Sequence, residues 1–160
     1  MFGHSLGGSA AATAMISDTR ILAGLNFDGG ILANATRLHG SDRIFINIGQ
    51  PGHGEFDFTW VDFADASKGP YVELEVTGSR HSTFMDLAIV AGAVGFDKET
   101  AKGLEGWVGD VEWGRVGGLM ERVVGAWGRW VFEGQVGGVL RGVDGEWREV
   151  VLVRGFEELV

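Results

Sequence analysis

The sequence contains no cysteine among its 160 residues, which excludes a disulfide, a thiolate nucleophile and a cysteine-bound metal. This absence does not fix the compartment, because many secreted proteins also have no disulfides, so secreted and cytoplasmic locations both stay open. Basic residues are few: 13 Lys and Arg stand against 22 Asp and Glu, for a net charge of −9. An acidic surface repels phosphate backbones, and we therefore expect no nucleic-acid partner.

Long apolar runs are missing as well. The longest, residues 87–96, contains two glycines and is too short to span a bilayer, so we predict no transmembrane segment. The content of 45% hydrophobic and 11% aromatic residues favours a folded globular protein over a disordered one. A chain of this length forms one domain that buries roughly 70% of its unfolded surface. The composition does not indicate an oligomeric state.

The first hundred residues alternate between helix-like and strand-like stretches. An alanine-rich helix is predicted over residues 9–16, and strands over residues 21–27, 43–48 and 71–77. Residues 55–66 are aromatic and acidic, which favours a loop with a short helix. Strands separated by helical crossovers predict an α/β fold, with a parallel sheet and helices on both of its faces.

The last 60 residues differ in composition, since they hold 14 of the 28 glycines and five of the six tryptophans. Apolar side chains recur at helical spacing and predict a packing helix over residues 119–132. Gly125 and Gly128 oppose it, because each costs about 1 kcal/mol relative to alanine in a helix. We expect the tryptophans to pack in the core rather than to form a ligand platform, and we expect a final strand over residues 147–153.

The start of the chain carries the motif with the most chemical content, Gly3-His4-Ser5-Leu6-Gly7. This Gly-x-Ser-x-Gly pattern is typical of a nucleophile elbow, in which a serine lies on a strained turn between a strand and a helix. Gly8 and the alanine-rich helix that follow strengthen this interpretation over an ordinary turn serine. Only two residues precede the motif, so we expect the strand before Ser5 to be almost entirely missing and one edge of the 21–27 strand to be unpaired.

A serine hydroxyl attacks only when a base removes its proton, and histidine suits that role because its ordinary pKa is about 6.5. A carboxylate then orients the imidazole and stabilises its protonated form. In α/β-hydrolases the chain order is Ser, then Asp or Glu, then His, each after a strand. Ser5, Asp28 and His81 follow this order, and parallel strands bring their carboxyl ends to one edge of the sheet.

Other residues compete for these roles. Asp28 precedes two glycines and is also compatible with a simple turn, and the alternative acids are Asp57, Asp62 and Asp65. The remaining histidines, which we interpret as structural or loop residues, are His4, His39 and His53. His53-Gly54-Glu55 is similar to part of a deaminase motif, but without cysteines the match is a coincidence.

Three blocks of the sequence resemble the signature blocks of platelet-activating factor acetylhydrolases of the isoform II type. They are Gly3-His4-Ser5-Leu6-Gly7-Gly8, Leu25-Asn26-Phe27-Asp28-Gly29 and Gly78-Ser79-Arg80-His81-Ser82-Thr83-Phe84-Met85-Asp86. Ile44-Phe45-Ile46-Asn47 is similar to the family's strand between the acid and the histidine. The separations of 23 residues from Ser5 to Asp28 and 53 from Asp28 to His81 also fit. The resemblance covers residues 1 to about 90 well and residues 91–160 only in outline.

The resemblance implies an incomplete α/β-hydrolase fold, with Ser5 as nucleophile, Asp28 as acid, His81 as base and the Leu6 backbone N–H as oxyanion donor. The implied reaction is hydrolysis of a short acyl ester, such as the sn-2 acetyl group of an ether phospholipid, through an acyl-serine and without a metal or organic cofactor. Oxidised phospholipids and other small esters fit equally well. The alternatives are a lipase, a cutinase-like polyesterase or an acyltransferase with the same triad, or a catalytically inert fragment.

The family's pattern also continues upstream of the elbow, with further strands and a loop that supplies a second oxyanion N–H. We therefore expect residues 1–160 to form one partial domain, the C-terminal half of a larger hydrolase that starts here at the elbow.

Overall fold

Five strands form one sheet in the sequence order β1-β2-β3-β4-β5. The computed structural model describes residues 1–95, 103 and 105–155. The strands are β1 (Phe2–His4), β2 (Ala23–Phe27), β3 (Ile44–Gly49), β4 (Tyr71–Val76) and β5 (Val150–Arg154). Strands β1 to β4 are parallel, and β5 runs antiparallel to β4 at the outer edge. The α/β fold class is thus confirmed, with one antiparallel edge strand in place of a purely parallel sheet.

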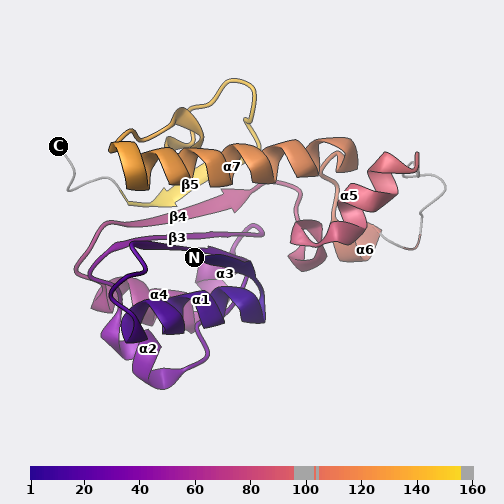
Figure 1. Ribbon diagram of the computed structural model, residues 1–160. Coiled ribbons are helices and arrows are strands. Elements are labelled where there is room, and N and C mark those ends of the chain that lie inside the picture. The colour runs from indigo at the N-terminus through magenta and orange to yellow at the C-terminus, as the bar shows by residue number, and fades with distance from the viewer. Residues whose placement is uncertain (96–102, 104, 156–160) are drawn as a thin grey trace.

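Helices cover both faces of this sheet (Figure 1). They are α1 (Leu6–Ser17), α2 (Asn34–His39), α3 (His53–Phe56), α4 (Phe58–Ala66), α5 (Asp86–Ala93), α6 (Glu105–Val108) and α7 (Trp113–Glu133), with 3₁₀ turns η1 (His81–Phe84) and η2 (Gly138–Arg141). The helices α1 to α4 lie on one side of the sheet, and the long α7 lies on the other side with η2 (Figure 1).

Alternation along the strands divides the core into two clusters. Leu25, Ile46 and Leu74 point to the side of α7 and belong to the larger buried cluster. On the opposite side Phe45 packs with Trp60 of α4 in a smaller cluster. Since both faces of β2 to β4 are covered, these strands are buried along most of their length.

The strand that carries the nucleophile motif is present, so the expectation that it is almost entirely missing is wrong. Phe2–His4 forms β1 and pairs in parallel with β2, Phe2 facing Leu25. Three residues suffice because backbone bonds extend the ladder at both ends: the Leu25 N–H donates to Met1 O at 3.1 Å and the Ser5 N–H to Phe27 O at 2.8 Å. The edge of β2 that was expected to be unpaired is therefore paired.

The predicted late helix exists and is longer than predicted, 113–133 in place of 119–132. Its glycines are tolerated because the apolar stripe of the helix is buried against the sheet. Trp113 and Trp130 are buried, as expected, whereas Trp107 is exposed and does not belong to the core.

Close packing of α1 on β2 depends on Gly8. A Cβ atom at Gly8 would lie 1.6 Å from Asn26 Oδ1, whereas one at neighbouring Gly7 would meet nothing within 4 Å. Asn26 cannot move aside easily, because its amide bonds both Gly29 and Asn47.

We expect Gly8→Ala to lower the free energy of unfolding by about 1–3 kcal/mol, the usual cost of overpacking. The matched control Gly7→Ala should instead be neutral or stabilising by up to about 1 kcal/mol, since alanine is the better helix former. Urea unfolding of both variants measures this, and equal stability of the two would contradict the packing described here.

Candidate active site

The polar residues predicted for catalysis meet at the carboxyl edge of the parallel strands. Ser5 follows β1, Asp28 follows β2, and His81 begins η1 after β4. Parallel strands put these three ends on the same side of the sheet. The structure thus brings together side chains that are 23 and 53 residues apart in the sequence.

Ser5 lies on a sharp turn with positive backbone φ of 55°, a conformation that costs free energy for a residue with a Cβ. The surrounding chain imposes it: a Cβ at Gly3 would lie 2.4 Å from the Gly7 carbonyl carbon, and one at Gly29 only 2.0 Å from Ser5 O. The two glycines let three backbone segments approach one another. The turn therefore presents the Ser5 hydroxyl above the sheet edge, as in a nucleophile elbow.

His81 joins the hydroxyl to the carboxylate. Its Nε2 lies 3.0 Å from Ser5 Oγ, and its Nδ1 lies 2.8 Å from Asp28 Oδ2. The Asp28 side chain is fully buried, whereas that of His81 is 47% exposed. Since a carboxylate can only accept, His81 Nδ1 carries the proton in this bond, and its neutral Nε2 is free to accept the proton of Ser5.

Contacts outside the triad hold His81 in place. The Asp110 N–H donates to Gly78 O at 2.7 Å, which ties the loop before His81 to the segment after α6. The Arg80 N–H donates to the Thr83 hydroxyl at 2.8 Å, and that hydroxyl donates to Val108 O at 2.5 Å. These bonds fix the start of η1 from two directions.

His4 is a further support of His81, although the sequence indicated only a structural or loop role. Its Nε2 lies 3.0 Å from the backbone oxygen of His81, and the ring centroids are 4.7 Å apart. Burial, together with the nearby His81, lowers the pKa of His4, so its ring is neutral. Because a carbonyl only accepts, His4 Nε2–H is the donor to His81.

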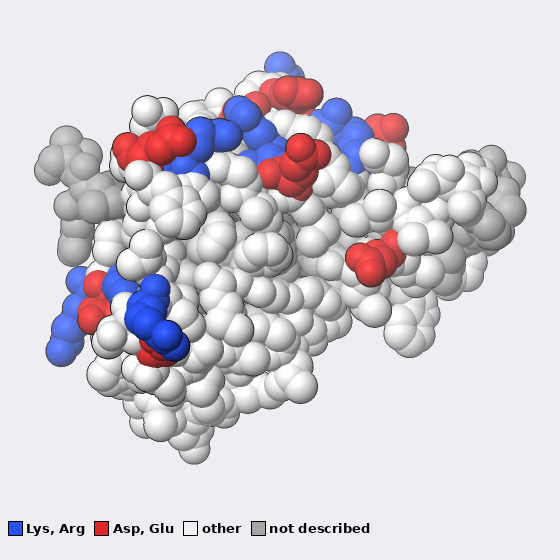
Figure 2. Space-filling model, in the orientation of Figure 1, with Lys and Arg blue, Asp and Glu red and all other residues white. Residues whose placement is uncertain are grey.

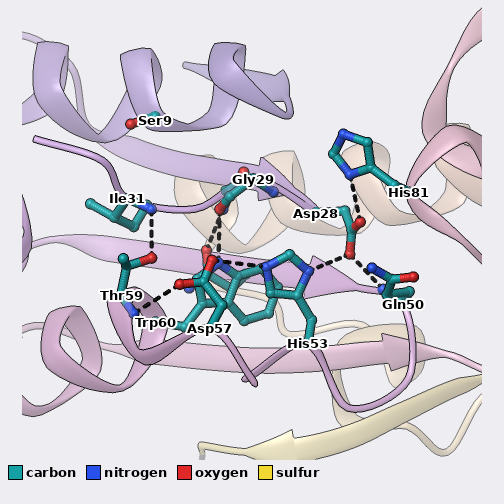
Figure 3. Close-up of polar contacts among 12 residues, drawn as sticks. Ser9, Asp28, Gly29, Ile31, Gln50, His53, Asp57, Thr59, Trp60 and His81 are labelled. Carbon is teal, nitrogen blue, oxygen red and sulfur yellow. Dashed lines mark hydrogen bonds and ion pairs between the residues drawn. The ribbon is translucent and has the colours of Figure 1, made fainter. Parts of the chain in front are cut away.

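Asp28 itself is held by donors on both of its oxygens (Figure 3). While Oδ2 faces His81, Oδ1 accepts from the Gln50 N–H at 2.7 Å and from His53 Nδ1 at 2.7 Å. Burial raises the pKa of Asp28, but the bonds from His53, Gln50 and His81 outweigh this effect and leave its pKa below the ordinary value. Asp28 is therefore ionised at neutral pH.

The loop after Asp28 is locked by side chains that the sequence analysis missed. The Asn26 side chain accepts from the Gly29 N–H at 3.1 Å and donates to Gly29 O at 2.5 Å, while Trp60 Nε1 donates to the same oxygen at 2.8 Å. These bonds hold Asp28 at a positive φ of 53°. A single asparagine in a buried strand is the only sequence signal of this role.

The other candidate acids lie elsewhere. Asp57 bonds His53 Nε2 at 3.2 Å and also accepts from the Thr59 N–H as the N-cap of α4. Asp62 pairs with Arg37 at 3.1 Å, and Asp65 with Arg154 at 2.6 Å. It is Asp28, and none of these three, that lies against His81.

The remaining histidines differ in their surroundings. His39 is exposed and lies at the end of α2 rather than in a loop. His53 begins α3 and is buried against Asp28, which agrees with the structural one of the two expected roles and not with a loop position. Its contact with a carboxylate four residues later is a helical i, i+4 pairing that the sequence does contain.

Leu6 is the first residue of α1, where the backbone N–H has no acceptor within the helix. The positive end of the helix dipole adds to the attraction for an anion at this point, and the first turn of α1 has no acidic residue. The Leu6 N–H therefore meets the requirements for an oxyanion donor next to Ser5.

Within the described residues, no group of three or more His, Asp or Glu side chains has the arrangement of a metal site. Among the helices of that same part of the chain, none combines the length and the hydropathy of a membrane span.

No family model matches the chain. Over 122 residues it is 34% identical to a protein of Arthroderma benhamiae named probable 1-alkyl-2-acetylglycerophosphocholine esterase, a match that covers 69% of the chain and 32% of the relative. The chain thus spans about a third of that relative's length.

A solved structure, the ferulic acid esterase of Streptomyces cinnamoneus, superposes with a TM-score of 0.79 at 24% identity. The superposition covers 96% of this chain and 46% of the esterase, and at this identity it shows the fold. The chain therefore shares the α/β-hydrolase fold over about half the length of that esterase, in agreement with the incomplete fold that was expected. Its expected resemblance to esterases of the platelet-activating factor acetylhydrolase type is confirmed by its curated relative.

Proposed function

We propose that the chain is a serine-dependent carboxylic ester hydrolase with Ser5 as nucleophile, His81 as general base and Asp28 as the acid that orients the base. The observation that carries this proposal is the pair of contacts of one imidazole, 3.0 Å to the Ser5 hydroxyl and 2.8 Å to the Asp28 carboxylate. The esterase name of the curated relative supports the same reaction class.

In the acylation step, Ser5 Oγ forms a bond to the ester carbonyl carbon while its proton passes to His81 Nε2. The carbonyl oxygen becomes an oxyanion, which accepts a hydrogen bond from the Leu6 N–H. The intermediate collapses when the bond between the acyl carbon and the alcohol oxygen breaks. The departing alcohol takes the proton from His81 and leaves an acyl group on Ser5.

In the deacylation step, a water molecule attacks the acyl carbon and gives a proton to His81 Nε2. The bond from the acyl carbon to Ser5 Oγ then breaks, and the protonated His81 returns the proton to Ser5. In both steps the imidazolium is stabilised by the buried carboxylate of Asp28, whose charge is not screened by water.

The substrate that we propose is an ester with a short acyl group. The name of the relative points to one such ester, the sn-2 acetyl ester of an ether phospholipid. A nucleic-acid partner is not proposed, because basic side chains lie beside acidic ones instead of gathering in a patch on the face seen in Figure 2. On α7, Arg122 pairs with Asp144 at 2.8 Å and Arg115 with Glu149 at 3.3 Å.

We expect Ser5→Ala to lower kcat for p-nitrophenyl acetate by about 10⁴-fold or more, because the residue forms the covalent intermediate. The matched control is Ser17→Ala at the end of α1, whose exposed hydroxyl bonds Thr13 O and which should leave the rate unchanged. Stopped-flow or plate-reader kinetics with the purified chain measure both variants. Equal rates for the chain and Ser5→Ala would favour the catalytically inert reading.

We expect Asp28→Asn to reduce kcat by about 10⁴-fold, because the amide favours the wrong tautomer of His81. Asp62→Asn tests an alternative acid and should change kcat little, since Asp62 lies on α4 and pairs with Arg37. The same ester assay distinguishes the two acids. A large loss in Asp62→Asn with activity retained in Asp28→Asn would reverse the assignment.

Acyl preference tests the substrate class separately. We expect kcat/KM to be highest for the acetyl ester in a p-nitrophenyl series from acetyl to octanoyl, and to fall as the chain lengthens. A rise with length would instead favour a lipase or a cutinase-like polyesterase. The same series with glycerol as competing acceptor would reveal an acyltransferase.

A further inference from the structure

The proposed mechanism uses one oxygen of Asp28, and the other oxygen is bound by a second histidine. His53 Nδ1 lies 2.7 Å from Asp28 Oδ1, while His81 Nδ1 lies 2.8 Å from Oδ2 (Figure 3). The same carboxylate thus binds two imidazoles, one half-exposed beside the nucleophile and one 6% exposed in the interior. The reaction steps above do not account for the buried one.

Both ring nitrogens of His53 face carboxylates. Opposite Asp28, His53 Nε2 lies 3.2 Å from Asp57 Oδ2. An ionised carboxylate only accepts hydrogen bonds, so the two contacts are satisfied together only when both ring nitrogens carry protons. The geometry therefore describes an imidazolium between two carboxylates, with a net charge of −1 for the three groups.

The ring has no freedom to leave this position. It stacks on Trp60 with centroids 4.2 Å apart and planes inclined by 16°, and Phe56 lies 5.0 Å away. Trp60 is itself fixed by its bond to Gly29 O in the loop that carries Asp28. The aromatic walls add to the stability of a cation.

We propose that His53 is a positioning residue of this site: held as an imidazolium between Asp28 and Asp57, it keeps the Asp28 carboxylate ionised and turned toward His81. The catalytic consequence rests on the proposed ester hydrolysis, whereas the charge state of His53 does not. Two donors on Oδ1, from His53 and from the Gln50 N–H, prevent rotation of the carboxylate. Oδ2 is then left for His81 alone.

The fixed cation also explains how Asp28 tolerates full burial. A buried carboxylate without a partner destabilises the folded protein, and in the proposed mechanism His81 becomes a cation only when it takes a proton from Ser5 or from water. His53 supplies a permanent charge, while Asp57 prevents an excess of positive charge that would oppose protonation of His81. The triad acid therefore remains an anion throughout the cycle.

Two further acidic residues, Glu73 and Glu75 of β4, lie near the segment that carries His53. Glu73 of β4 lies beneath α3, where a Cβ on Gly54 would be 2.0 Å from its Oε1, and Glu75 accepts from the Gly52 N–H at 2.7 Å. Burial is the main cause that raises the pKa of Glu73, so Glu73 gives up its proton less readily than an exposed glutamate does. Burial lowers the pKa of His53, but its bonds to Asp28 and Asp57 outweigh this and raise the pKa above 6.5.

Two variants separate the charge of His53 from its hydrogen bond. Asp57→Asn removes one carboxylate. The amide oxygen of the new asparagine can still accept the Thr59 N–H and cap α4. His53→Leu removes both the cation and the donor to Asp28. The control is His39→Asn, at the exposed end of α2.

We expect His53→Leu to lower kcat for p-nitrophenyl acetate by about 10- to 100-fold with KM nearly unchanged, by analogy with the loss of a partner that orients a metal ligand. Asp57→Asn should cause a smaller loss, because a neutral His53 still donates to Asp28. His39→Asn should match the unmodified chain. An unchanged kcat in His53→Leu would overturn the positioning role.

The charge state is measured without any turnover, by ¹⁵N NMR of the chain labelled at histidine. We expect both ring nitrogens of His53 to be protonated at pH 7.5, and the titration of this ring to move to lower pH in Asp57→Asn. A singly protonated His53 at pH 7.5 would overturn the proposal even if the chain hydrolyses esters. Conversely, an imidazolium in a chain without esterase activity would leave His53 as described and refute only the proposed function.

The pH dependence of thermal unfolding tests independently whether the pKa of His53 is raised in the folded protein. A histidine whose pKa is raised in the folded state stabilises the protein fully below about pH 6.5, and this stabilisation is lost as the pH rises through the folded-state pKa. We therefore expect the Tm difference between the chain and His53→Leu to shrink from pH 6 to pH 9. A difference that grows over this range would contradict a buried cation.

Discussion

The structure of this site depends on one buried carboxylate. Asp28 is removed from water, and a charge in that position is stable only when its oxygens are matched by donors. Three donors supply that match: one from the half-exposed His81, one from the backbone of Gln50 and one from the interior His53. Gln50 and His53 both follow β3, and His81 follows β4, so the carboxylate joins the ends of β2, β3 and β4.

The fold makes this convergence possible by storing local strain at two points. Ser5 and Asp28 are the non-glycine residues of positive φ in the described part of the chain, and both directly follow parallel strands. Each is held by its neighbours: Ser5 by the approach of Gly3 and Gly29, and Asp28 by the two bonds of Asn26 to Gly29. Strain retained at adjacent strand ends is typical of sites in which side chains must be aimed.

Much of this arrangement was accessible from the sequence. The Gly-x-Ser-x-Gly pattern, together with an aspartate and a histidine directly after buried strands, indicated which side chains would meet, because parallel strands end at a common edge. The late helix was also predicted, over 119–132 where the structure has 113–133, since its apolar stripe outweighs its glycines. The motif, the residues directly after the strands and the apolar stripe each lie within a short stretch of the chain, so they can be recognised from the sequence.

Features that depend on tertiary contact were missed or misjudged. β1 has only three residues and is a strand because β2 lies beside it, so no periodicity revealed it. The pairing of β5 in antiparallel orientation follows from the path of the chain after α7 rather than from the pattern of its residues. A structural and a loop role both stayed open for His53, because nothing in its neighbourhood in the sequence shows that it stacks on Trp60 and bonds Asp28.

The central claim is that His81 activates Ser5, and covalent labelling tests it most directly. The purified chain is incubated with a fluorophosphonate, and the modified peptide is located by mass spectrometry in parallel with His81→Ala. The account predicts an adduct on Ser5 in the unmodified chain and its loss or strong slowing in the variant. Labelling at another residue, or labelling of Ser5 at the same rate without His81, would contradict it.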